Sequence, residues 1–78
     1  MNRSHAEHVI DARGLSCPEP VVRTRQAMLQ STASELTVVV SEQVSAENIQ
    51  RMANSSGWRV VIEREADDIW LLLTRPSE

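Results

Sequence analysis

Apolar and polar positions change their period several times along the chain, and each change marks a predicted element. Short apolar runs rich in β-branched residues predict strands, whereas apolar residues at every third or fourth position predict helices. By these signals we predict strands over residues 8–12, 35–41, 58–64 and 69–74, and helices over residues 18–31 and 45–56. The short polar run between the last two strands predicts an antiparallel hairpin.

Each predicted helix has an apolar face and terminal residues that suit a helix end. Prolines are tolerated in a first turn, where backbone amides lack intrahelical acceptors, so Pro18 and Pro20 fit the start of the first helix. We expect Ser45 to cap the second helix and Gly57 to end it in a left-handed conformation. The inward positions of the first helix are Val21, Thr24, Ala27 and Met28. Those of the second helix are Ile49, Met52 and Ala53.

The predicted order β-α-β-α-β-β indicates an α/β fold of the α+β two-layer sandwich type. Two helices are enough to cover one face of a four-stranded sheet. The first two strands are joined through a helix and should be parallel, so with the hairpin the sheet is mixed. We expect one domain over residues 1–78 and a second sheet face that stays partly open for docking. Trp58 and Trp70 are expected to pack in the core, although one of them could lie on that open face.

Composition and charge exclude several classes of function. The formal net charge is −3 and the basic residues are all arginine, which argues against direct nucleic-acid binding and removes lysine chemistry. Two glycines cannot build a glycine-rich phosphate loop. The longest apolar stretches, 37–40 and 69–73, are too short to span a bilayer, and no signal peptide is visible. We therefore expect a soluble cytoplasmic protein that binds no membrane, metal or cofactor.

Cys17 is the sole cysteine and falls at or next to the start of the first predicted helix. A helix N-terminus favours a thiolate, because its unpaired amides carry partial positive charge. Pro18 and Pro20 lack amide hydrogens, which leaves the amides of Glu19 and Val21, and their fixed φ angles should hold the sulfur outward. The charge of Glu19 opposes ionisation, and Arg13 or Arg23 could offset it. We expect a moderately activated, exposed thiol.

The residues around Cys17 also bear on other possible roles of this cysteine. A lone cysteine can be an inert core residue, since free cysteines are among the most buried residue types. A disulfide oxidoreductase normally pairs two cysteines, and a cysteine hydrolase needs a histidine base, whereas His5 and His8 lie far from the loop. One cysteine and two poorly placed histidines also make a weak metal site. A carrier of sulfur needs only one exposed thiol, because its partner enzymes supply the remaining chemistry.

The string VIDARGLSCPEPVVRTRQAM resembles the signature of the TusA/SirA/YedF sulfur-carrier family. The resemblance rests on a Cys-Pro-x-Pro (CPxP) box, Cys17 to Pro20, after a lead-in that contains Asp11, Gly14 and Leu15. It implies a carrier that takes sulfane sulfur as a persulfide on Cys17 from a cysteine desulfurase or rhodanese-like donor and passes it to an acceptor protein. The residues expected to support the thiol are Arg13, Gly14, Pro18, Glu19 and Pro20.

Several alternatives remain open at this level. The glutamate of the box is typical of TusA-like members, whose sulfur serves tRNA thiolation, whereas related proteins serve sulfur oxidation or cofactor assembly. The segment 41–48 looks more like the YedF branch, which is linked to selenium metabolism. Another alternative is a non-catalytic regulatory or interaction module. We expect a monomer that meets its partners transiently. Asp11 could orient the Cys17 loop or simply end the first strand.

Overall fold

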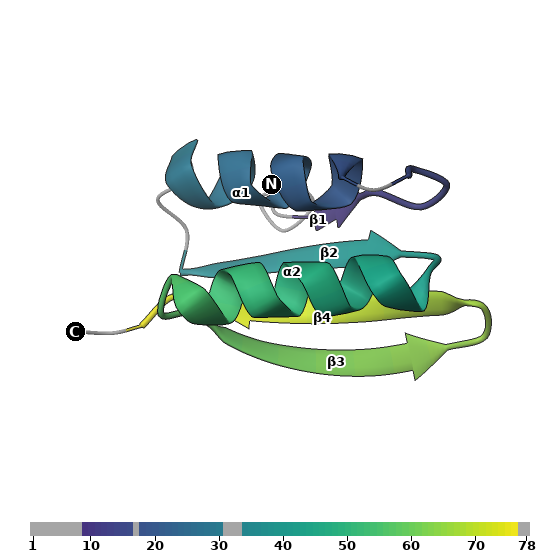
Figure 1. Cartoon of the computed structure of the whole chain (residues 1–78). Coiled ribbons are helices and arrows are strands. Elements are labelled where there is room, and N and C mark those ends of the chain that lie inside the picture. Colours follow the sequence, from purple (N-terminus) through teal and green to yellow (C-terminus); the bar gives the residue numbers. More distant parts are fainter. Residues whose placement is uncertain (1–8, 17, 31–33, 77–78) are drawn as a thin grey trace, which may run out of the picture.

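The computed structural model describes residues 9–16, 18–30 and 34–76, and these residues follow the predicted order β-α-β-α-β-β (Figure 1). The strands are β1 (Val9–Asp11), β2 (Glu35–Val40), β3 (Arg59–Glu65) and β4 (Asp68–Thr74). The helices are α1 (Glu19–Gln30) and α2 (Gln43–Ser55). Every predicted element is therefore present, with small shifts at its ends.

The sheet is mixed and has the strand order β1-β2-β4-β3. Strand β1 pairs parallel to β2, and β4 pairs antiparallel to both β2 and β3. The parallel first pair and the antiparallel hairpin are confirmed. Strands β2 and β4 occupy the centre, which suits their runs of Val and Leu because a central strand loses the most surface to its neighbours.

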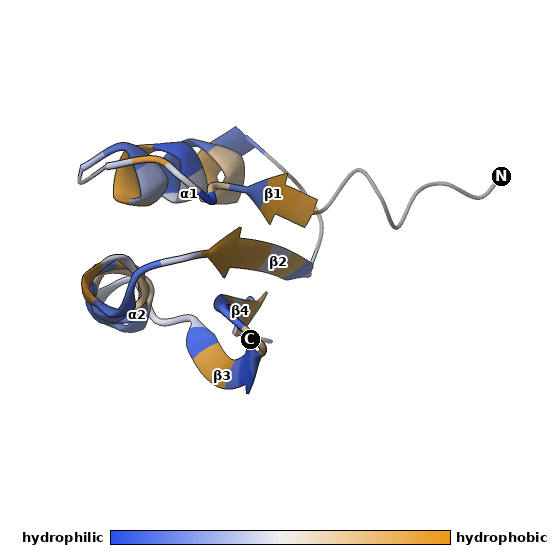
Figure 2. Cartoon of the chain, turned by 90° about the vertical axis from the view of Figure 1, so that its right-hand side faces the viewer, coloured by the Kyte–Doolittle hydropathy of each residue, from blue (hydrophilic) through white to orange (hydrophobic). Residues whose placement is uncertain are grey.

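Both helices lie on one side of the sheet, as Figure 2 shows, so the fold is the expected two-layer sandwich. Alternate residues of β2 and β4 point toward the helices and form the buried core with residues of α1 and α2. The core residues of the two central strands are Leu36, Val38, Val40, Ile69, Leu71 and Leu73. No described segment covers the opposite face of the sheet, which we call the open face (Figure 2).

The two tryptophans lie on different faces. Trp58 is buried in the core, and the guanidinium of Arg75 lies 4.6 Å from the centre of its ring. Trp70 is half-buried and alternates with the inward residues Ile69 and Leu71, so it belongs to the open face. Core packing is confirmed for Trp58. Trp70 is the tryptophan that lies on the open face, the alternative position considered for one of the two.

The predicted cap of α2 was wrong, whereas its predicted end is confirmed. Helix α2 begins at Gln43, and its N-cap residue is Glu42, which has extended backbone angles and makes no side-chain capping bond. Ser45 lies inside the helix and is buried on the same face as Ile49. Gly57 ends the helix with a φ of +90°, a conformation that favours glycine.

The buried hydroxyl of Ser45 gives a stability prediction. Its Oγ has no hydrogen-bond partner within the described part of the chain, and a buried hydroxyl without a partner costs free energy. Ser45→Ala should therefore raise the free energy of unfolding by roughly 0.5–1 kcal/mol. Urea denaturation followed by circular dichroism measures the change. Ser55→Ala is the control on the exposed side of α2, where the hydroxyl donates to the carbonyl of Met52 at 2.9 Å, so its removal should not raise the free energy of unfolding. A loss of stability in Ser45→Ala would contradict the prediction.

Candidate functional site

The segment between β1 and α1 carries the predicted site, and its first half is held against the sheet. The amide of Ala12 donates to the carbonyl of Val39 at 2.9 Å, which prolongs the contact of β1 with β2. The chain then turns at Gly14, whose φ is +79°, and the amide of Leu15 donates to the carbonyl of Ala12 at 3.3 Å. Leu15 is half-buried and packs against the core.

Cys17 lies outside the described residues, as do His5 and His8. The residues on either side of the cysteine, Ser16 and Pro18, are exposed. Helix α1 begins two residues after Cys17 in the sequence, at Glu19.

The amide of Glu19 at the start of α1 is not free, contrary to the expectation from the sequence. The amide of Glu19 donates to the carbonyl of Ser16 at 2.8 Å, so this amide is already occupied and the N-terminus has fewer donors to offer a thiolate than we expected. Pro20 is buried in the first turn, and its carbonyl accepts a hydrogen bond of 2.8 Å from the hydroxyl of Thr24. Pro18 and Pro20 therefore have different surroundings, the first exposed and the second packed under the helix.

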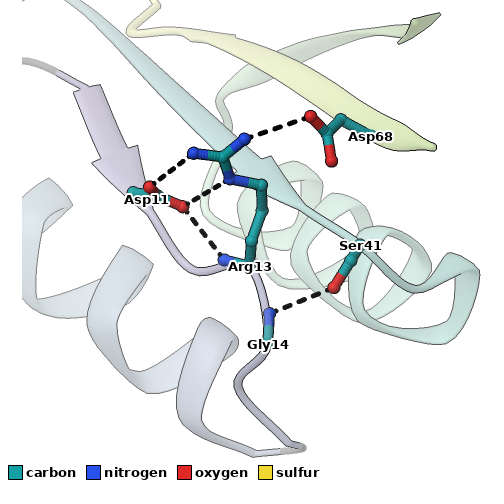
Figure 3. Close-up of polar contacts among 5 residues, drawn as sticks. All are labelled: Asp11, Arg13, Gly14, Ser41 and Asp68. Carbon is teal, nitrogen blue, oxygen red and sulfur yellow. Dashed lines mark hydrogen bonds and ion pairs between the residues drawn. The ribbon is translucent and has the colours of Figure 1, made fainter. Parts of the chain in front are cut away.

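A three-residue ion-pair network links the beginning of the loop to the first residue of β4, which lies at the same end of the sheet (Figure 3). The carboxylate of Asp11 accepts hydrogen bonds from Nε and Nη2 of Arg13, at 2.9 and 2.8 Å, and also from the Arg13 amide at 3.2 Å. The remaining nitrogen, Nη1, donates to Asp68 Oδ2 at 3.1 Å. The guanidinium therefore spans two carboxylates from different strands. Because both of these partners are acidic, the charge of Arg13 is balanced within this network.

A second contact fixes the turn itself. The amide of Gly14 donates to Oγ of Ser41 at 3.1 Å, and Ser41 follows β2 directly (Figure 3). The loop is thus held by side chains from the ends of two other strands. These contacts set the position from which the chain leaves the sheet at Leu15.

Sequence reasoning missed Ser41 and Asp68 as parts of this loop. A signal for Ser41 exists, because the carboxyl ends of adjacent parallel strands meet at one edge of a sheet. No comparable signal identifies Asp68, since its approach depends on β4 lying next to β2. Asp11, for which a role in orienting the loop and a role in ending the first strand were both considered, ends β1 and is paired with Arg13.

The charge of Glu19, which was expected to oppose ionisation of the thiol, has a partner on the same helix. Arg23 Nε lies 3.2 Å from Glu19 Oε1, one turn further along α1, and both side chains are more than half exposed. The arrangement is a surface pair of modest strength. The pair brings the side chain of Arg23 to the first turn of the helix, where it offsets the charge of Glu19.

The ion pair changes the acidity of Asp11. The side-chain hydrogen bond from Arg13, followed by that from the Arg13 amide, lowers the pKa of Asp11 from 3.8 to about 2. The same carboxylate, with Asp68, raises the pKa of Arg13. A depressed carboxyl pKa adds stability above the unfolded-state pKa, and that contribution is lost as the pH falls from 3.8 toward about 2.

Arg13→Gln should return the pKa of Asp11 toward 3.8, because the charged donor that lowers it is removed. An NMR titration of the side-chain carboxyl resonances measures the midpoint directly. Arg23→Gln is the matched control, since it removes an arginine that pairs with Glu19 instead. Added salt should also move the wild-type midpoint toward 3.8 through screening. An unchanged midpoint in Arg13→Gln would contradict the assigned cause.

Comparison with known families covers nearly the whole described chain. A family model described as sulfurtransferase TusA matches residues 8–75. Within the described residues, no helix is long and apolar enough to cross a membrane.

Individual relatives agree with that match. A protein of Methanocaldococcus jannaschii, described as a candidate sulfur carrier, is 36% identical over 59 residues, which is 74% of this chain and 79% of the relative. A protein of Bacillus subtilis with the same description is 32% identical over 59 residues, or 76% of this chain and 79% of the relative. The crystal structure of a SirA-like protein from Desulfitobacterium hafniense superposes with a TM-score of 0.78 at 29% identity. It covers 88% of this chain and 97% of that one.

Proposed function

Because this chain belongs to the TusA sulfurtransferase family, we propose that it is a sulfur carrier that holds a persulfide on Cys17. The observation that carries the proposal is the family match over residues 8–75, which includes the sole cysteine within its Cys-Pro-x-Pro box. Candidate sulfur carriers among the relatives point the same way. The exposed neighbours Ser16 and Pro18 support access of a partner to this part of the loop.

The proposed transfer needs one thiolate and two partner proteins. The Cys17 thiolate attacks the outer sulfur of a donor persulfide, a new S–S bond forms, and the donor S–S bond breaks to release the donor thiolate. The outer sulfur of the Cys17 persulfide is then attacked by an acceptor thiolate, which regenerates the Cys17 thiolate. Each step exchanges one S–S bond for another, so no external oxidant or reductant is consumed.

The surrounding residues act on the position of the loop. Gly14 supplies the positive φ of the turn, and Ser41 holds its amide. Arg13 joins Asp11 to Asp68 and fixes the departure of the loop from β1. Pro18 and Pro20 restrict the backbone at the helix start, while Glu19 is paired with Arg23. We assign these residues the role of positioning Cys17 for contact with its partners.

The donor belongs to the cysteine desulfurase or rhodanese-like class, and the acceptor is a downstream protein thiol. We place the exchange in the reducing cytoplasm, where a free thiol persists. The protein acts as a monomer in transient complexes. The identity of the acceptor protein determines which pathway receives the sulfur, whether tRNA thiolation, sulfur oxidation or cofactor assembly.

Intact-protein mass spectrometry tests the proposal. The reduced protein is incubated with a cysteine desulfurase, cysteine and pyridoxal phosphate, and in parallel with rhodanese and thiosulfate. We expect a gain of one sulfur atom that is reversed by dithiothreitol, because a persulfide is reducible. Absence of that gain with both donor classes would contradict the carrier function and favour the interaction module.

A further inference from the structure

The open face of the sheet contains a shallow groove that the carrier chemistry does not use. It runs over the β3–β4 hairpin and is lined on this face by side chains of Thr37, Val61, Glu63, Glu65, Trp70 and Leu72. Its cavity volume is about 550 Å³. Two further lining residues direct their side chains elsewhere: Leu71 into the core, and Arg64 to a hydrogen bond with Gln43 of α2.

The strand register places the groove residues in adjacent rows. Thr37, Leu72 and Val61 lie side by side across β2, β4 and β3, and they form an apolar row. In the next row, Trp70 lies beside Glu63. Glu65 lies opposite Asp68 in the strand register, at the hairpin end. Val61 is 54% exposed and its register partner Leu72 is 38% exposed, so two adjacent aliphatic side chains of this face contact solvent.

Charge gives the groove its selectivity. Glu63 and Glu65 are exposed, and neither side-chain carboxylate makes an ion pair or a hydrogen bond within the described part of the chain. Two carboxylates beside an aromatic ring and aliphatic side chains offer both an ionic and a cation–π contact to one positively charged side chain. A phosphate-bearing ligand would be repelled by the same carboxylates.

We propose that this groove docks a basic segment of a partner protein, in which an arginine or lysine is followed by aliphatic residues. The cation lies against Glu63, Glu65 and Trp70, while the aliphatic residues cover Val61 and Leu72. A second copy of this chain fits less well, because two acidic grooves would face each other. The proposal stands whether or not Cys17 carries sulfur, since none of the groove residues belongs to the loop.

The acidic end of the groove lies close to that loop in the fold. Glu65 is the register partner of Asp68, and Asp68 holds Arg13 at the base of the loop. A segment bound along the hairpin would therefore lie at the end of the sheet from which the loop departs. Docking on the open face thus leaves the helix layer uncovered.

NMR titration of the ¹⁵N-labelled protein tests the proposal with a defined probe, the peptide acetyl-RLLRLL-amide. We expect saturable shifts of backbone amides in residues 61–65 and 70–72. Changing Glu63→Gln and Glu65→Gln together should weaken binding about threefold to tenfold, the loss expected for two exposed charge contacts. Val61→Thr, a change of similar shape, should weaken it through lost apolar contact.

The controls separate this groove from other sources of binding. Glu42→Gln removes the same charge outside the groove and should leave the affinity unchanged, and the peptide acetyl-ELLELL-amide should not bind. The proposal is overturned if the shifts are confined to the helices, or if no saturable shift appears at millimolar peptide. It is also overturned if the double glutamine variant binds the peptide with the same affinity as the wild type. Shifts of the same amides with protein concentration alone would assign the face to a second copy and also overturn it.

Discussion

Cys17→Ser is expected to abolish sulfur loading from either donor class, while leaving the fold unchanged. A serine hydroxyl cannot form a persulfide, because its oxygen is not a nucleophile toward sulfane sulfur at neutral pH and no second cysteine exists to replace it. Loading is measured by intact mass after incubation with the donor, and the fold by the amide spectrum. The expected result is no detectable sulfur adduct.

The matched control for this experiment is Ser16→Ala, which alters the neighbouring side chain and keeps the thiol. Its carbonyl, which accepts from the amide of Glu19, is preserved, so we expect loading close to that of wild type. Equal adducts on wild type and Cys17→Ser would place the sulfur elsewhere and refute the assignment of Cys17. Loss of loading in Ser16→Ala as well as in Cys17→Ser would indicate that the loop as a whole, and not the thiol alone, limits transfer.

Leu71→Ala is expected to lower the free energy of unfolding by about 2–5 kcal/mol, the cost of deleting a buried leucine side chain and leaving a cavity. Leu71 has no exposed surface and lies in the central strand β4, beside Val38 of β2 and Ile62 of β3. A domain of this size has a total stability on the order of 5–15 kcal/mol, so this one change removes a large fraction of it. Chemical denaturation at equilibrium gives the value.

Leu29→Ala provides the same chemical change on the surface. Leu29 is 76% exposed on α1, so its truncation removes little buried area, and we expect a change of less than about 0.5 kcal/mol. Equal losses in the two variants would mean that the core is not centred on β4. A destabilised Leu71→Ala that still loads sulfur at low temperature would separate folding from transfer.

The hydrophobic pattern predicted the elements because each period has a direct structural meaning. Strands 35–41 and 69–74 are dense in aliphatic residues, and they became the central strands β2 and β4. The position of β4 between β2 and β3 could not be predicted, since periodicity says which face is buried and nothing about which strand is adjacent. Ser45 was misassigned for a related reason. Serine is favoured at N-caps, but the inward face of α2 extends to it.

The candidate site was predictable where the requirement is local. Glycine at a turn with positive φ and prolines near a helix start follow from backbone geometry alone, and both are observed at Gly14 and Pro20. The direction of the Arg13 side chain was not predictable, because its partner Asp68 is 55 residues away in the sequence. Only the strand order brings the two together. Long-range ion pairs of this kind need the topology before they can be inferred.

The shortness of β1 has a consequence for motion. This strand has three residues and pairs only with β2. It therefore has fewer ladder hydrogen bonds than any other strand of the described sheet. Segments with few buried contacts open locally at a lower free energy than the whole domain. Amide hydrogens of β1 should therefore exchange with solvent before those of β2 and β4. The described start of the loop, residues 12–16, can then shift together with β1 while the centre of the sheet stays closed.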